Sequence, residues 1–181
     1  MQLENEEGWE FDRFLWKKNI PPKVSFMLWA IFHESLPTYN MLIRRDVEVQ
    51  SEVCVMCKME NETADHLLVN CSYAYEVWSY FLNAFKVSLV APNTVKAFFE
   101  SWRMNSLSGR CKEIWWKIIY AVMWHLWKER GKGASGGREK TAEELIMLVK
   151  QTIMLWLINS DVFRGYDVNQ ILFNWISLLH M

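Results

Sequence analysis

Hydrophobic residues recur every three or four positions along most of this chain, which is the period of an amphipathic α-helix. One such segment follows Pro21 and carries Val24, Met27, Leu28, Ile31 and Phe32. A second follows Cys71 and carries Ala74, Val77, Trp78, Phe81, Leu82 and Phe85. The pattern predicts one helix that begins near Pro22 and ends by His33, and another that begins just after Cys71.

The densest apolar helix is predicted from about Arg110 to Arg130, and most of its circumference is hydrophobic, so most of it should be buried. Four glycines follow between positions 131 and 137, which predicts a flexible linker. Thr141 and Glu144 have the spacing of a capping box, which predicts a last long helix through Ile158.

Two shorter helices are predicted from capping residues, one after Thr38 and one after Thr63. Only seven glycines and four prolines occur in 181 residues, which favours long helices over a turn-rich β-fold. The predicted fold class is therefore all-α. The chain is expected to divide into a helical domain (1–90), a continuation of the same core (91–130), a linker (131–140) and a C-terminal helical extension (141–181).

Composition and charge narrow the classes of function. Half of the residues are hydrophobic and eleven are Trp, which is enough for a packed core. A net charge of −1 does not by itself indicate nucleic-acid binding, but residues 103–140 hold nine Lys or Arg against three Glu. The candidate nucleic-acid-binding residues in this region are Arg110, Lys112, Lys117, Lys128, Arg130 and Lys132.

Three cysteines and one histidine have the spacing of a metal site: Cys54, Cys57, His66 and Cys71. Two thiolates on a short loop bind one side of a zinc ion, and a His and a Cys from a later segment complete the tetrahedron. On a continuous α-helix, residues 66 and 71 would face different ways, so the helix that bears His66 should end just before Cys71. Cys111 is expected to be a core residue.

Four protein ligands leave no open position for a water molecule, so the predicted zinc is structural and not catalytic. The sequence Gly133-Ala134-Ser135-Gly136-Gly137 formally matches a nucleophile elbow, but charged segments flank it in place of a strand and an apolar helix. His33 and His125, on predicted apolar helix faces, are interpreted as packing residues. We therefore expect a non-enzymatic protein.

Several ordered motifs resemble one known family. They are Ile20-Pro21-Pro22-Lys23-Val24, Leu36-Pro37-Thr38, Cys54-x2-Cys57 with Glu62-Thr63, His66-Leu67 and Cys71, and Trp124-x2-Trp127-Lys128-Glu129-Arg130. Together they are similar to the zinc-binding domain of plant LINE-type (non-LTR) reverse transcriptases. The resemblance implies that the same four residues bind zinc and that the module holds RNA or DNA.

Two partner classes stay open at this point. A zinc module derived from a retrotransposon reverse transcriptase would bind RNA or single-stranded DNA. The alternative is a domesticated protein-interaction module that acts through its Trp-rich surface and C-terminal helix, although that helix could equally pack on its own domain. No segment is long enough to span a membrane, and we expect an intracellular protein, nuclear or cytoplasmic. The pattern does not predict an oligomeric state.

Overall fold

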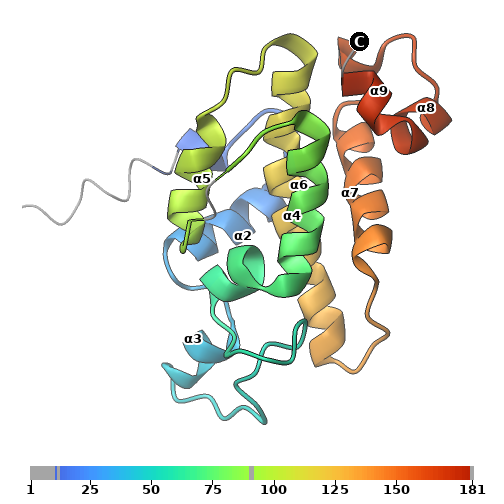
Figure 1. Ribbon diagram of the computed structural model, residues 1–181. Coiled ribbons are helices and arrows are strands. Elements are labelled where there is room, and N and C mark those ends of the chain that lie inside the picture. Colours follow the sequence, from blue (N-terminus) through green and yellow to red (C-terminus); the bar gives the residue numbers. More distant parts are fainter. Residues whose placement is uncertain (1–10, 12, 90–91, 180–181) are drawn as a thin grey trace, which may run out of the picture.

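The computed structural model describes residue 11, residues 13–89 and residues 92–179, and within these ranges the protein is built from helices without a β-sheet (Figure 1). The predicted all-α class is confirmed. The elements are α2 (Pro22–Phe32), α3 (Tyr39–Ile43), the π-helix η1 (His66–Asn70), α4 (Ser72–Phe85), α5 (Val95–Arg103), α6 (Gly109–Ala134), α7 (Ala142–Trp156), the 3-10 helix η2 (Asp161–Phe163), α8 (Val168–Phe173) and α9 (Trp175–Leu179).

Helix α6 is the centre of the molecule, because α2, α4, α7 and η1 all pack against it (Figure 1). Its apolar residues cover most of its circumference, and most of them are buried, as the sequence pattern predicted, whereas Trp116, Trp124 and Trp127 are partly exposed. Trp115 of α6 stacks on Trp102 of α5 with 3.8 Å between ring centroids. Each indole N–H donates to the backbone carbonyl of the other residue. This reciprocal pair fixes α5 against α6.

The predicted caps are present in the structure. The Thr38 hydroxyl accepts a hydrogen bond from the Met41 N–H at the start of α3. Thr141 and Glu144 form the complete capping box that begins α7. The side-chain oxygens of these residues accept hydrogen bonds from backbone N–H groups that the start of a helix leaves unpaired.

The prediction that the glycine-rich linker begins at position 131 is wrong. Helix α6 continues through Gly131 and Gly133 to Ala134, so the loop before α7 begins at Ser135. Gly136 then adopts a φ of +75°, which only glycine reaches without strain. The chain reverses there, and the Gly137 N–H donates to the Lys132 carbonyl.

Helix α7 packs on α4 and α6. Leu145 and Ile153, on the apolar face of this helix, are buried in the core that α7 shares with the rest of the described chain. The C-terminal helix is therefore part of the domain, which is the simpler of the two interpretations of its apolar face. None of the helices in the described part of the chain combines the length and apolar character that crossing a bilayer needs.

His125 is buried between α6 and α7, where its Nε2 lies 2.7 Å from the Thr152 hydroxyl oxygen. The prediction of a hydrogen-bonded packing residue is confirmed for His125. His33, by contrast, is exposed at the end of α2, and its Nδ1 lies 2.8 Å from the Trp29 carbonyl oxygen. Burial, together with the positive charges of Lys128, Lys132 and Lys140, lowers the pKa of His125 to about 4.

This lowered pKa predicts a loss of stability in mild acid. The unfolded chain, in which His titrates near 6.5, binds more protons than the folded chain between pH 6.5 and 4, so stability is present at neutral pH and falls as the pH drops. Between pH 7 and 5 we expect His125 to lower the free energy of unfolding by about 2 kcal/mol. Urea denaturation at both pH values measures this, and the His125→Gln variant should lack that part of the loss. An equal loss in both proteins would contradict the prediction.

Candidate metal centre

The first two cysteines lie on a short looped hairpin. Val53 and Asn61 form an isolated antiparallel bridge, and the Cys54 N–H donates to the Glu60 carbonyl. Between these pairings the chain turns through Lys58, whose φ is +59°. The turn directs the side chains of Cys54 and Cys57 to the same side.

The other two ligand candidates lie at the two ends of the π-helix η1. The Thr63 hydroxyl accepts the His66 N–H, as the predicted cap requires. The Cys71 N–H then donates to the His66 carbonyl, five residues earlier, and Cys71 itself is extended. The wide π-turn brings two residues five apart to the same side, which a continuous α-helix would not do. The predicted helix end before Cys71 is confirmed.

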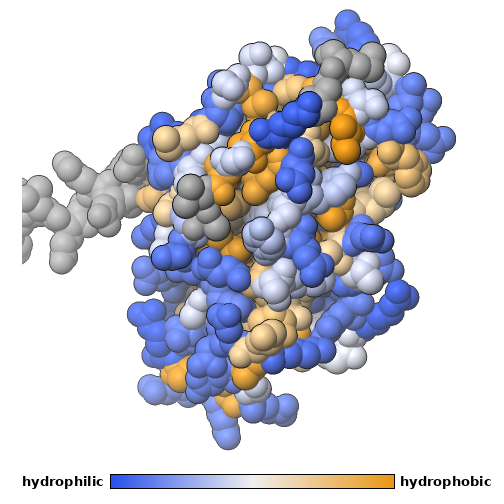
Figure 2. All heavy atoms as spheres, viewed as in Figure 1, coloured by the Kyte–Doolittle hydropathy of each residue, from blue (hydrophilic) through white to orange (hydrophobic). Residues whose placement is uncertain are grey.

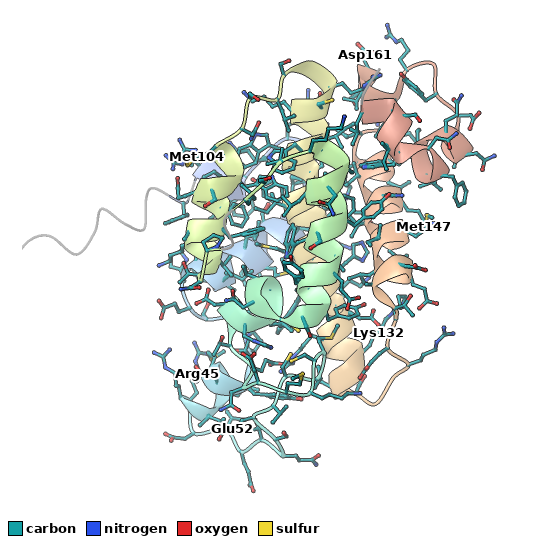
Figure 3. All side chains as sticks on the ribbon, in the orientation of Figure 1. Arg45, Glu52, Met104, Lys132, Met147 and Asp161 are labelled. Atoms are coloured by element: carbon teal, nitrogen blue, oxygen red, sulfur yellow. The ribbon has the colours of Figure 1, made fainter. Side chains whose placement is uncertain are left out.

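The four predicted ligand atoms converge, and all lie within 4.8 Å of one another. The Cys54 and Cys71 sulfurs are 4.0 Å apart, and the Cys57 sulfur is 3.3 Å from His66 Nε2. In a zinc tetrahedron with bonds of about 2.3 Å to sulfur and about 2.0 Å to nitrogen, such pairs are roughly 3.8 and 3.6 Å apart. Figure 3 shows the sulfur atoms gathered between the loop that bears Glu52 and the lower end of α6, where Lys132 is labelled. The arrangement fits one tetrahedral metal ion.

The chemistry of the cluster also suits a metal. Cys54 and Cys71 are buried, and the hydrogen bond between the two thiols, together with burial, raises the pKa of Cys54. The hydrogen bond from Cys54 lowers the pKa of Cys71. Buried thiolates of this kind need a nearby cation to stay ionised. The other ring nitrogen of His66, Nδ1, is buried without a well-aligned hydrogen bond, and Glu60 Oε2 lies 3.3 Å away. A carboxylate in that place orients a metal-bound histidine.

The end of the molecule formed by α3 and the adjoining loops is mostly hydrophilic in the view of Figure 2. A buried ion pair links these loops to the helical body: Arg130 of α6 donates to both carboxylate oxygens of Glu62, at 2.7 to 3.1 Å. Glu62 also accepts the Tyr39 N–H. An exposed ion pair between Lys58 and Glu139 joins the loops to the segment that follows α6.

The six candidate nucleic-acid-binding residues do not form one surface. Arg130 is buried in the ion pair with Glu62, and Arg110 donates to the Tyr166 hydroxyl and the Leu178 carbonyl. The exposed side chains of Lys128 and Lys132 lie farther along α6, and Lys132 is 3.8 Å from Glu129. The remaining two, Lys112 and Lys117, line a common cleft. Arg110 and Arg130 are structural because their guanidinium groups are held by groups of the fold.

The cleft contains four basic residues that the sequence analysis missed: Arg13, Lys17, Lys18 and Arg103. The adjacent pair Lys17-Lys18, directly after an aromatic cluster, was the signal available in the sequence. Cys111 takes no part in the metal cluster, and its thiol donates to the Leu179 carbonyl. It packs against the core, as predicted.

The protein is thus a helical domain whose loops carry a Cys3His cluster that could hold one metal ion. Residues 1–78, which include all four cluster residues, match the model of a family described as zinc-binding in reverse transcriptase. The N-terminal part of the chain is therefore similar to this family, and the resemblance seen in the sequence motifs is confirmed. The match also supports the retrotransposon origin.

One curated relative is the Arabidopsis thaliana protein named "Putative ribonuclease H protein", which is 28% identical over 166 residues. The alignment covers 88% of this chain but only 24% of that relative, so the chain spans about a quarter of its length. No solved structure gave a significant match.

Proposed function

We propose that this protein is a non-enzymatic module, stabilised by one structural zinc ion on Cys54, Cys57, His66 and Cys71, that binds single-stranded RNA or DNA. The observation that carries the binding function is the basic cleft beside α6. Closed coordination by four side chains supports a structural role for the metal, because no position is left for a reacting water. Three cysteine ligands need a reducing environment, so an intracellular location, nuclear or cytoplasmic, is part of the proposal.

The cleft has the charge and shape for a phosphate backbone. It has a volume of about 540 Å³ and contains six basic residues, namely Arg13, Lys17, Lys18, Arg103, Lys112 and Lys117. Glu113 is in its lining, and Glu100 pairs with both arginines, so the described residues around the cleft have an excess of four positive charges (six minus two). An excess of this size on one concave surface attracts polyanions even though the net charge of the whole chain is −1.

Aromatic side chains line the same cleft. Phe14 and Trp116 stack with 5.9 Å between ring centroids, and the Tyr120 hydroxyl donates to the Phe14 carbonyl. The buried Lys117 ammonium donates to the Lys18 carbonyl, which fixes the N-terminal segment along α6. Basic grooves with aromatic walls are typical of proteins that bind single strands without sequence preference.

The proposal predicts salt-sensitive binding. If four phosphates are neutralised, the affinity for a single strand should fall roughly fifty-fold between 50 and 200 mM salt. Fluorescence anisotropy with a labelled 20-nucleotide dT strand measures this. Replacing Lys17 and Lys112 by Ala should weaken binding and lower the slope of log affinity against log salt by about 1.4.

A matched control removes two positive charges elsewhere. Arg138 and Arg164 are exposed and pair only with neighbouring acids in the described structure, Glu144 and Asp161. The Arg138→Ala/Arg164→Ala variant should keep the wild-type slope. Affinity that does not depend on salt, or equal effects of the two double variants, would overturn the assignment of the cleft.

A second candidate function is protein binding. It is favoured by exposed apolar residues toward the C-terminus, which are Leu155, Ile158, Val168, Phe173 and Ile176. A pull-down with and without nuclease treatment separates the two functions: partners captured through nucleic acid disappear after treatment, whereas partners bound to this apolar set remain.

A further inference from the structure

Three rings stack on the solvent side of α2. Phe26 and Trp29 have ring centroids 5.7 Å apart and planes 18° apart, and Trp29 and His33 are 4.5 Å and 27° apart. Phe26 is 64% exposed and Trp29 is 38% exposed. We call Phe26, Trp29 and His33 the ring stack.

The ring stack is not needed to pack α2 on the core. The opposite side of the helix does that with Val24, Met27, Leu28 and Ile31, all of which are buried. Large aromatic side chains left exposed in a row suggest contact with a ligand, because their burial would remove much apolar surface from water.

Positive charges link the ring stack to the basic cleft. Lys23 precedes Phe26 by three residues, so the two side chains are neighbours on one face of α2. The Lys23 ammonium lies 5.3 Å from the Trp124 ring centroid, and the Lys128 ammonium lies 5.9 Å from the same centroid. Trp124 lies two turns along α6 from Lys117 of the cleft. Lys23 and Lys128 therefore place two positive charges beside Trp124, on the same helix as Lys112 and Lys117 of the cleft and next to Phe26 of the ring stack.

We propose that the ring stack is a stacking platform for unpaired bases of the strand whose phosphates lie in the cleft. The inference rests on the proposed function and specifies its ligand as an unpaired strand with its bases present. Stacking of bases on aromatic side chains tolerates any sequence, because every base has a π-face. The neighbouring lysines complement the backbone charge of such a strand, and they would repel a basic protein partner.

The test compares two labelled strands of equal length and charge, a 20-nucleotide dT strand and its abasic counterpart. Wild-type protein should bind the dT strand at least ten-fold more tightly. The Phe26→Ala/Trp29→Ala variant should lose most of this preference while its salt slope stays unchanged, since the rings contact bases and not phosphates. The single variant Phe26→Ala removes an exposed ring with little effect on folding and should show a smaller loss in the same direction.

Phe173 provides the matched control, because it is 68% exposed on α8, away from α2 (Figure 1). Phe173→Ala should bind both strands as the wild type does. If wild-type protein binds both strands equally and with a steep salt dependence, the platform is overturned and the proposed function stands. If it binds neither strand, both are overturned. Equal losses in the Phe26 and Phe173 variants would also overturn the platform.

Discussion

Replacing Cys71 by Ser is expected to abolish zinc binding and to unfold the loops around the metal centre. Zinc binding contributes on the order of 10 kcal/mol in small zinc domains, because the site forms only when the chain folds. Cys71 is buried and begins α4, and the preceding π-helix buries Leu67 and Leu68 in the core. The loss should therefore reach the helical body and lower the melting temperature strongly. Zinc per chain by elemental analysis and thermal melting by circular dichroism measure both effects.

Cys111→Ser is the matched control for this variant. Cys111 lies outside the cluster and donates to a backbone carbonyl, a contact that a serine hydroxyl also makes. This variant should keep one zinc ion per chain and a nearly unchanged melting temperature. A wild-type protein that lacks stoichiometric zinc, or that keeps its melting temperature in a strong chelator, would refute the metal centre.

Replacing Arg130 by Ala is expected to lower the free energy of unfolding by about 3–5 kcal/mol. Glu62 is completely buried, and without Arg130 its carboxylate would stay buried with no opposite charge. The Arg130 guanidinium also lies over the rings of Tyr39 and Trp127, at 4.5 and 5.2 Å from their centroids. Urea denaturation of the zinc-loaded protein at neutral pH measures the loss.

The exposed pair of Arg138 and Glu144 serves as a control for Arg130→Ala. Its side chains are largely in water, so Arg138→Ala should change the free energy of unfolding by no more than about 1 kcal/mol. The double variant Glu62→Leu/Arg130→Met should be less destabilised than Arg130→Ala alone, since it leaves no unpaired buried charge. Equal losses of unfolding free energy in Arg130→Ala and Arg138→Ala would show that the buried ion pair stabilises the protein no more than the exposed pair does.

Features set by neighbouring residues were predictable from the chain alone. The capping box of Thr141 and Glu144 and the helix end before Cys71 depend on hydrogen bonds between residues three to five positions apart. The convergence of the four metal-site side chains followed from their spacing, although the π-turn that allows it did not, because its wide hydrogen bonding has no distinct sequence pattern.

The nucleic-acid-binding residues were only partly predictable. Arg130 and Arg110 were chosen as surface charges because they lie in a basic segment, yet their partners are Glu62, 68 residues earlier, and the C-terminal residues Tyr166 and Leu178. Charge counted along the chain cannot distinguish a free base from one held by a distant group.

Most of the helices before Ile158, the caps at Thr38, Thr63 and Thr141, and the four converging side chains of the metal site could be predicted from the chain alone. Which bases share a surface depends on tertiary packing. It brought residues 13–18 beside Arg103 and the first turns of α6 to form the cleft, and it buried Arg130 against Glu62. The difference is the separation along the chain of the residues that interact. Local hydrogen bonds and side-chain periodicity involve residues a few positions apart, whereas clefts and buried ion pairs form only after distant segments have packed together.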